Sequence, residues 1–521
     1  MKNKFLLIPL LFLLASCTDD NFEEEKQPVS FTAEESRVIE ELARKIPKLT
    51  EIEAMQYALD AASCISPSSV LTKANTKTIK NSLPLSISRN ISTRSSTLPD
   101  TVAYIFNFDN NEGFAIVAAD IRVPDKLLAY VETGSLELET DNPGLAIFLD
   151  RAEEYIKQSL EKAEAEKDSI FQVILDKLII DSPELAESIK TRNGDFPPPK
   201  GGGLLGPDGK PIGGPDPDGE GGPIIDPRPG DDDIYCLAEI SYHDWQNAQV
   251  IGPLTAVEWN QRAPYNTLLQ QPRCDNNELP PVGCVAVAVA QIMAHWKYPQ
   301  EIKPYFFNWN EMVRYTGDFE RNNRFGNKWV NSVIRAPAPV RNNIAQLMER
   351  IGFNVGIEYD CDASSGNSDK AVSWMQRMGF LGGEKSDYDI NKIRSSLLNN
   401  SIVYARGSSK KNKFLGITIY YSGGHAWNYD GLMEQKRQKD VRYIWINRRT
   451  DKVIRESSAT FYEYRNLVHC NWGWDGISNG YYHSGVFDTN STPPLPSGTR
   501  NSEGTSGHYQ YDLEIYTNLR R

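Results

Sequence analysis

The chain has 521 residues, and its hydrophobic content of 40% with 10% aromatic residues suits about two to four globular domains. The formal net charge of −13 argues against nucleic acid as a partner.

The N-terminus has the pattern of an export signal. Lys2 and Lys4 precede an apolar stretch, residues 5–14, that is too short to span a bilayer. Leu14-Ala15-Ser16-Cys17 then resembles a bacterial lipobox, which implies a signal peptide over 1–16, a lipid on Cys17 and a lipidated acidic tether over 17–30. The acidic run resembles the surface-export signal of Bacteroidetes lipoproteins, so we expect a bacterial outer-membrane or cell-surface lipoprotein, or release after processing. A plain signal peptide with a chance cysteine is the alternative.

Residues 31–140 have the pattern of a small α+β domain. Apolar spacing between 27 and 59 predicts a helix or a helix pair. Residues 63–99 are rich in Ser and Thr and predict a flexible loop. Three β-rich runs then predict an antiparallel sheet, at 102–108, 114–120 and 127–131.

Two further segments separate this domain from the rest of the chain. Residues 145–191 predict one long amphipathic helix or a hairpin, within a helical extension over 141–194. Residues 195–233 are rich in Pro and Gly and cannot form a core, so they predict a linker. The linker is either a plain spacer or a protease-accessible hinge, with candidate cleavage sites at Lys200, Lys210 and Arg228.

From residue 234 to 521 the pattern predicts one large α+β domain around the segment 280–299. Alternating Val and Ala would fit a strand, but the length of the run and its Ala, Gln and Met content favour a helix that begins at Cys284. A thiol at a helix N-terminus is favoured as a thiolate nucleophile. The alternative is a small buried apolar residue. Further along, we expect a helix at 345–351 and strands at 402–405 and around 443–445.

A nucleophilic cysteine needs a base, and the chain has six histidines. His295 stands eleven residues after Cys284, at the far end of the same predicted helix, which is too distant. His425 follows two glycines and precedes a strand, and it is the better candidate. Each histidine could also be an ordinary structural residue.

The other cysteines do not have the pattern of a disulfide framework or of a metal site. Apart from Cys17 and Cys284 they number five, so they cannot all pair within one chain: Cys64, Cys236, Cys274, Cys361 and Cys470. No CxxC is present, and only the adjacent His469 and Cys470 approach a cluster of ligands. No metal and no cofactor are predicted.

Three motifs in order resemble the streptopain family of papain-like cysteine peptidases: residues 282–293 around Cys284, Gly423-Gly424-His425-Ala426, and Asn471-Trp472-Gly473-Trp474. The sheet at 102–132 resembles the inhibitory propeptide of the same family. The resemblance implies an α+β fold in which a central helix carries the cysteine and packs on an antiparallel sheet that carries the histidine.

The resemblance also implies roles at matching positions. Cys284 resembles the nucleophile and His425 the general base, which together would form an ion pair. Gln261 resembles the glutamine that joins the Cys284 backbone N–H in the oxyanion hole. Trp472 resembles the tryptophan that shields the histidine, and Asn471 is available as an orienting carbonyl. Candidate substrate walls are Ser364, Ser365, Gly366, Ser422, Gly423 and Gly424.

We therefore expect a secreted, lipid-anchored cysteine endopeptidase, made as an inactive zymogen, that hydrolyses host or environmental polypeptides and is inhibited by its own propeptide. The alternatives are a Cys-His amidase or transglutaminase, and a non-catalytic surface-binding lipoprotein. Two features depart from the family's prototype: the helical segment 145–191, and polar insertions between 431 and 443 and between 447 and 461, which predict longer surface hairpins.

Overall fold

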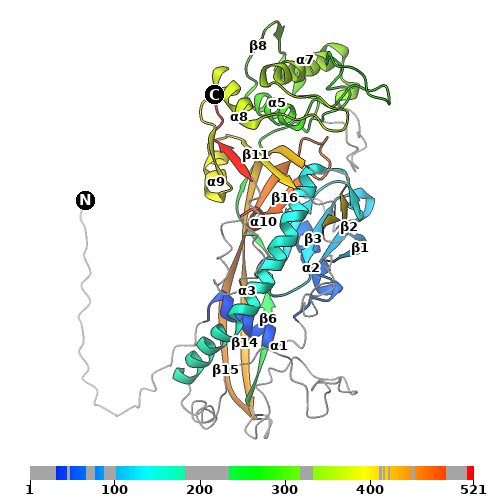
Figure 1. Cartoon of the computed structure of the whole chain (residues 1–521). Coiled ribbons are helices and arrows are strands. Elements are labelled where there is room, and N and C mark those ends of the chain that lie inside the picture. The colour runs from blue at the N-terminus through cyan, green and yellow to red at the C-terminus, as the bar shows by residue number, and fades with distance from the viewer. Residues whose placement is uncertain are drawn as a thin grey trace, which may run out of the picture.

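The computed structural model describes residues 31–43, 47–65, 77–86, 101–181, 234–316, 332–409, 413–414, 417–419, 423–447, 452–488 and 513–521. The predicted signal peptide, Cys17, the acidic tether, the Pro/Gly linker with its three candidate cleavage sites, and Ser422 lie outside these residues. A helical region forms one end of the molecule, a twisted sheet forms its middle, and a long β-ribbon extends from the sheet to the opposite end (Figure 1).

The N-terminal region contains the predicted helix pair, α1 (Ala33–Ala43) and α2 (Glu51–Ile65). The three predicted strands are also present, as β2 (Ala103–Phe108), β3 (Phe114–Ala118) and β4 (Leu127–Val131). The prediction of a loop over 63–99 is wrong in part, because β1 (Ile79–Leu85) lies within it and pairs with β2. Only Leu85 of β1 is fully buried, so this edge strand depends on backbone pairing and leaves no apolar pattern in the sequence.

The segment after this sheet forms β5 (Glu139–Thr140) and then α3 (Pro143–Asp181), which is one continuous helix over its described length. Asn142 caps α3, since its Oδ1 accepts hydrogen bonds from the backbone N–H of Gly144 and Leu145 at 3.0 and 3.1 Å. The predicted apolar side of the helix is confirmed, with Leu145, Phe148, Leu149, Ile156 and Leu160 in the core and Tyr155 packed against it.

The C-terminal region, after the linker, contributes further helices, some of which form the top of Figure 1. They are α5 (Cys284–Trp296), α6 (Trp309–Met312), α7 (Ala338–Val355), α8 (Ser368–Arg377), α9 (Ile390–Leu398) and α10 (Ser484–Phe487). The predicted helix at Cys284 is confirmed, and its residues from Val285 to Ala294 are all buried. The helix expected at 345–351 is the second half of the longer α7.

One twelve-stranded sheet runs through both regions of the chain, in the order β1-β2-β3-β4-β16-β15-β14-β11-β17-β10, with β6 and β7 paired to β14. The strands after the linker are β6 (Ile234–Tyr242), β7 (Gln246–Ile251), β10 (Glu384–Asp387), β11 (Val403–Ser409), β14 (Gly423–Asn447), β15 (Lys452–Asn471), β16 (Gly480–His483) and β17 (Glu514–Thr517). Short strands complete the structure: β8 (Glu301–Ile302), β9 (Tyr305–Phe306), β12 (Lys413–Phe414) and β13 (Ile417–Ile419).

The N-terminal sheet joins the sheet of the C-terminal region where β4 pairs antiparallel with β16. Gly480 is needed at this junction, because a Cβ there would lie 2.6 Å from the Tyr130 carbonyl oxygen. One hydrophobic cluster combines residues of both regions, whereas the cluster around α5 contains only residues between 257 and 519. The two regions therefore share a core, and the C-terminal region also has one of its own.

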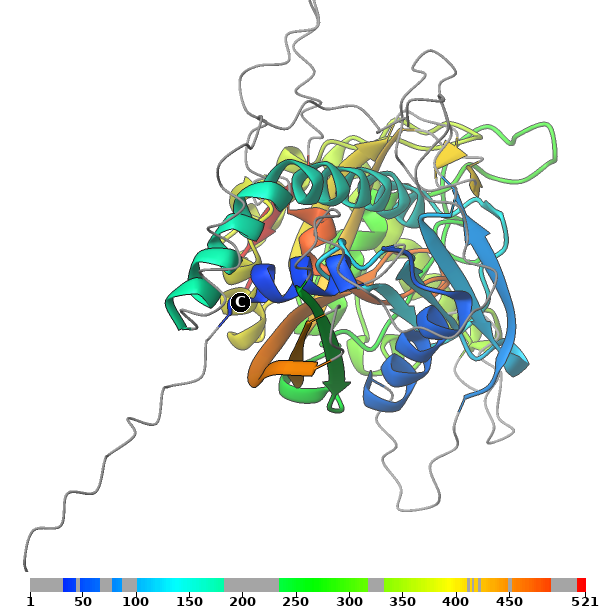
Figure 2. The ribbon, with the colours of Figure 1, turned by 90° about the horizontal axis from the view of Figure 1, so that it is seen from below.

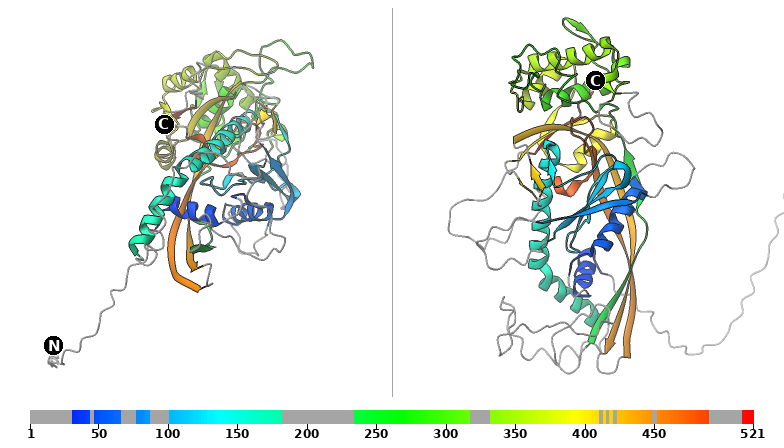
Figure 3. Two further views of the ribbon diagram at one scale, coloured as in Figure 1. Left: turned by 60° about the horizontal axis from the view of Figure 1, so that its bottom comes forward. Right: turned by 90° about the vertical axis from the view of Figure 1, so that its right-hand side faces the viewer.

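The predicted polar hairpins are in fact a single ribbon. β14 pairs with β15 from Asn428 and Asn471 out to Asn447 and Lys452. β6 and β7 pair along the other edge of β14. We call the outer part of this ribbon, residues 432–447 and 452–467 with β6 and β7, the arm. Figures 2 and 3 show α1 and α3 lying alongside it. Among the described residues, no helix is both long and apolar enough to cross a membrane.

Candidate active site

Cys284 is the first residue of α5, and the chain enters the helix through Gly283, which has a φ of 90°. This backbone conformation favours glycine. The backbone N–H groups of Ala426, Val285 and Cys284 itself lie near the Cys284 sulfur and lower its pKa. A thiol is therefore placed at a helix N-terminus, in contact with the strand that carries the candidate base.

His425 precedes Ala426 in β14 and is buried. Its Nε2–H donates to the backbone carbonyl oxygen of Trp472 over 2.8 Å. Its ring stacks on Trp427, with 6.2 Å between centroids and 11° between planes. Its Nδ1 is buried and has no hydrogen-bond partner among the described residues. The carbonyl of Trp472 thus selects one tautomer and leaves Nδ1 as the nitrogen able to accept a proton.

Burial shifts the pKa values of Cys284 and His425 towards their uncharged forms. Burial raises the pKa of the Cys284 thiol, and the three backbone N–H groups offset this only in part. Burial also lowers the pKa of His425 to about 4, against the opposing effect of its bond to Trp472. Burial therefore opposes the charged form of each group, and with it the ion pair predicted from the family.

The prediction that Asn471 supplies the orienting carbonyl is wrong for this structure. The Asn471 side chain accepts from Gln291 Nε2 at 3.0 Å and donates to the Val257 carbonyl at 2.9 Å. The oxygen that contacts His425 belongs to the backbone of Trp472, one residue further along. Every residue carries such a carbonyl, so no side-chain pattern could have identified it.

A buried network of amides holds the three site elements together. Gln291 lies on α5, seven residues after Cys284 and so on the same side of the helix. Its Oε1 accepts from Asn428 Nδ2 at 2.9 Å, on the strand of His425, while its Nε2 donates to Asn471 beside Trp472. Asn428 also donates to the Ala288 carbonyl at 3.1 Å. No sequence motif predicted this network, although Gln291 and Asn428 are polar residues within apolar runs.

Gln261 is buried close to the cysteine segment, because its backbone carbonyl accepts from Val282 N–H at 2.8 Å. Trp472 is fully buried, and its Nε1 donates to the Ser478 carbonyl at 3.0 Å. Its ring lies 5.3 Å from that of Trp427, on which His425 stacks. The structure therefore brings Gln261, Trp472, His425 and Cys284 into one region.

The predicted substrate wall at 364–366 lies beside the Cys284 helix. Ser364 Oγ donates to the Pro281 carbonyl at 2.6 Å, and Ser365 exchanges two backbone bonds with Glu358. A Cβ on Gly366 would come within 3.1 Å of Val285. Gly423 and Gly424 begin β14 directly before His425.

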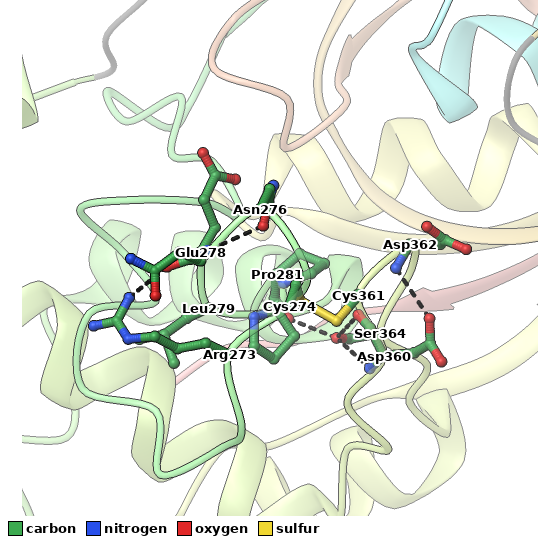
Figure 4. The surroundings of a disulfide bond; sticks show 12 residues. Arg273, Cys274, Asn276, Glu278, Leu279, Pro281, Asp360, Cys361, Asp362 and Ser364 are labelled. Carbon is green, nitrogen blue, oxygen red and sulfur yellow. Dashed lines mark hydrogen bonds between the residues drawn. A yellow bond between two sulfur atoms is a disulfide. The ribbon is translucent and has the colours of Figure 1, made fainter.

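A disulfide bond between Cys274 and Cys361 ties this wall to the segment that leads into Cys284 (Figure 4). The cysteines are 87 residues apart in sequence, so their pairing arises only in the folded chain and could not be predicted from spacing. Cys64, Cys284 and Cys470 are free. Within the described segments, no group of three or more His, Cys, Asp or Glu residues could hold a metal ion.

The N-terminal region contacts the site at the start of α3. Asn142 Nδ2 donates to the Ile477 carbonyl at 2.9 Å, in the loop that follows Trp472. Gly144 packs against the indole so closely that a Cβ would lie 2.1 Å from the Trp472 ring. β5 pairs in parallel with β13, shortly before the His425 strand.

Comparisons with known proteins agree with this arrangement. Residues 259–482 match the Peptidase C10 family, and residues 47–156 match the Spi protease inhibitor family. The inhibitor match extends across the predicted boundary between the segments 31–140 and 141–194.

Thiol protease/hemagglutinin PrtT of Porphyromonas gingivalis is 25% identical over 276 residues, which cover 49% of this chain and 25% of that protein. Streptopain of Streptococcus pyogenes is 23% identical over 282 residues, which cover 49% of this chain and 58% of that protein. The chain thus spans less than two thirds of the length of either relative.

Among solved structures, a fragment of Prevotella intermedia prointerpain A is similar over 81% of this chain, with 18% identity and a TM-score of 0.39. Active interpain A from the same organism is similar over 53% of this chain, with 19% identity and a TM-score of 0.32. The predicted α+β class is confirmed, with the cysteine helix against the sheet that carries the histidine. The chain belongs to the Peptidase C10, or streptopain, family through residues 259–482, and it carries a Spi-type inhibitor propeptide ahead of them.

Proposed function

We propose that this protein is a cysteine endopeptidase made as an inactive zymogen, which hydrolyses peptide bonds of polypeptide substrates. The most direct support is the position of the Cys284 thiol, which lies at a helix N-terminus and next to the strand that carries His425. The Nε2 atom of this histidine is bound to the Trp472 carbonyl, which leaves Nδ1 able to accept a proton. A cysteine with a positioned imidazole is the arrangement required for nucleophilic acyl transfer.

In the proposed reaction, His425 Nδ1 takes the proton of Cys284, and the thiolate attacks the scissile carbonyl carbon. The oxyanion is bound by the Cys284 backbone N–H and the Gln261 side-chain amide, an interaction typically worth about 3 kcal/mol per donor. The imidazolium then protonates the leaving amine, and the C–N bond breaks to leave a thioester. Water, deprotonated by His425, attacks the thioester, which releases the carboxylate product and restores the thiol.

The N-terminal region is proposed to inhibit the enzyme until the linker over 195–233 is cut. Its contacts with Trp472 and Ile477, and the shift of the thiol and imidazole pKa values towards their uncharged forms, support a latent site. The proposed location is the bacterial cell surface, through a lipid on Cys17, with the peptidase region released or retained after processing.

The test uses the full chain and its Cys284→Ala variant. We expect the wild type to cut itself in the linker and to hydrolyse casein, and the variant to do neither. N-terminal sequencing of the mature protein should place its start between about 190 and 235, in the linker region. Undiminished casein hydrolysis by the variant would contradict the proposal.

Two further assays separate the alternatives. Incorporation of an amine into casein without hydrolysis would instead indicate a transglutaminase. An epoxide-type thiol inhibitor that fails to label Cys284 in the processed chain would indicate a non-catalytic binding protein.

A further inference from the structure

The arm buries charged side chains on one of its faces. Along β14, Gln435, Arg437 and Lys439 are buried, while the alternate residue Lys436 is exposed on the opposite face. On β15, Arg465 is 2% exposed. Lys and Arg are rarely buried so fully unless something pairs with them. This face is therefore built to be covered by a partner with complementary chemistry.

In the intact chain the partner is the N-terminal region. Glu40 of α1 forms a salt bridge with Lys439, with 3.1 Å between Oε2 and Nζ. Tyr57 of α2 lies under the Arg437 guanidinium, 5.5 Å from its Cζ to the ring centre. Figure 3 shows α1 between α3 and the arm. The other buried carboxylates of α1, on Glu35 and Glu41, are bound by lysines of α3.

Residues after the linker hold the cationic groups in place without the N-terminal region. Arg437 Cζ lies 4.1 Å from the Tyr242 ring centre and 4.7 Å from that of Trp245. Arg465 Cζ lies 4.0 Å from Trp245. We call the group Tyr242, Trp245, Arg437, Lys439 and Arg465 the cradle.

The cradle has an excess of positive charge once the N-terminal region leaves. Among the side chains that the structure describes, its three cations then face one arm carboxylate, Glu463, which lies 2.6 Å from Arg437 and 3.9 Å from Lys439. Nη2 of Arg465 is buried with no hydrogen-bond partner among the described residues. Burial lowers the pKa of Arg465 to about 10, so it stays charged at neutral pH. The cations of the cradle can therefore bind a further carboxylate, and its aromatic rings can contact apolar side chains next to that carboxylate.

We propose that the cradle is an exosite of the processed enzyme that binds acidic, amphipathic segments of polypeptide substrates in the place of α1 and α2. This proposal rests on the proposed peptidase function. Lys439 lies fourteen residues from His425 on the same strand, which is a span of about 45 Å. The bound segment is thus remote from the scissile bond, and binding there raises the local concentration of the substrate without altering the chemistry.

The test compares three recombinant substrates with the processed enzyme. All contain one cleavable peptide and a flexible Gly/Ser spacer of about 60 residues, long enough for the span. The first has no tail, the second carries the segment 31–65 as a tail, and the third carries this tail with Glu40→Gln. We expect the tail to lower KM about tenfold in the wild type, with equal kcat, and the Glu40→Gln tail to lose most of this gain.

Enzyme variants identify the surface. In Lys439→Gln and in Arg437→Gln, we expect the KM ratio between tailless and tailed substrates to approach one. Lys436→Gln removes the same charge from the opposite face of the same strand and should keep the wild-type ratio. Each enzyme is measured with the tailless and the tailed substrate. The KM ratio therefore does not depend on how much of that enzyme is folded and active.

Several results would overturn the exosite. The first is a wild-type enzyme with equal KM for the tailless and the tailed substrates. The second is a wild-type KM ratio between these substrates in both Lys439→Gln and Arg437→Gln. The third is equal KM for substrates with the original tail and with the Glu40→Gln tail. A processed enzyme that sediments as a dimer and loses dimerisation with Lys439→Gln would assign the cradle to a second copy instead. If the wild type cleaves neither substrate, the peptidase function fails, and fluorescence anisotropy of the labelled 31–65 segment with the same enzymes still decides the exosite.

Discussion

At the scale of single residues, a backbone carbonyl and a buried amide side chain fix the geometry of the site. The imidazole of His425 is oriented by a backbone carbonyl, and Gln291 connects the cysteine helix to both strands of the site. Neither group needs to touch a substrate. Both act by fixing the geometry between Cys284 and His425, to which acyl transfer is sensitive.

Replacing Gln291 with Leu should reduce both stability and turnover. The change removes two buried hydrogen bonds, so we expect the free energy of unfolding to fall by about 1–3 kcal/mol. Because α5 is then no longer fixed against β14 and β15, kcat of the processed enzyme should fall by about tenfold with KM little changed. Gln300→Leu is the control, since Gln300 is exposed on the surface. Denaturant melts and steady-state kinetics measure the two effects. A loss of stability with kcat unchanged would show that Gln291 only supports the core.

The reactivity of Cys284 should depend on pH in a defined direction. Burial raises the thiol pKa in the intact chain, so the thiolate is scarce at pH 7 and increases as pH rises. Alkylation by iodoacetamide should therefore be slow at pH 7 and accelerate steadily towards pH 10, followed by mass spectrometry of the Cys284 peptide. After processing we expect faster alkylation at pH 7. A rate that is high and flat between pH 5 and 8 in the intact chain would instead indicate a preformed ion pair.

At the scale of elements, the proposed inhibition by the N-terminal region rests on where α3 begins. Its first turn places Gly144 against the Trp472 ring, and its cap Asn142 bonds to Ile477 of the loop that follows. The helix thus docks on the residue whose carbonyl orients His425, which places the N-terminal region in contact with the site.

Gly144→Val should loosen this docking. A side chain at position 144 cannot fit, because a Cβ would lie 2.1 Å from the indole. We expect the start of α3 to move away and self-processing in the linker to become about tenfold faster, a change worth about 1.4 kcal/mol. Gel analysis of processing over time measures this. Lys162→Val, on an exposed part of the same helix, should process at the wild-type rate. Slower processing of Gly144→Val would argue that the contact does not restrain the site.

At the scale of the whole molecule, long-range links decide the architecture. The sheet passes from the N-terminal region into the peptidase region at β4 and β16, and the disulfide joins segments 87 residues apart. The ribbon carries the same strands from the site to the arm. Separation of the two regions therefore requires more than a cut linker, because shared pairing and a shared core must also be broken.

Replacing Cys274 and Cys361 together with Ser should destabilise the peptidase region by up to about 4–5 kcal/mol, through the entropy of the unfolded chain. The wall at 364–366 also loses an anchor, so KM should rise while Cys284 keeps its reactivity. Denaturant melts with and without reductant provide the check. The wild type should move to the value of the double variant when reduced, and the variant should not respond. Identical melts for oxidised and reduced wild type would contradict the role of the bond.

Much of the fold was predictable because buried helices and strands leave periodic apolar patterns. The α1–α2 pair, β2 to β4, the apolar side of α3 and the helix of Cys284 all have such patterns. β1 was missed, since an edge strand depends on backbone bonds that any sequence can form. The arm was mistaken for surface hairpins, because its buried face carries Gln435, Arg437 and Lys439 and resembles an exposed one.

The sequence by itself determined the order of the regions, the helix that begins at Cys284 and the strand of His425, through local periodicity and turn chemistry. Only the tertiary structure decided which carbonyl orients the histidine, which cysteines pair, and what covers the arm. The physical reason is that these depend on contacts between groups far apart in the chain. A backbone oxygen, a thiol or a buried Arg gains its role from its neighbour in space, and local sequence does not specify that neighbour.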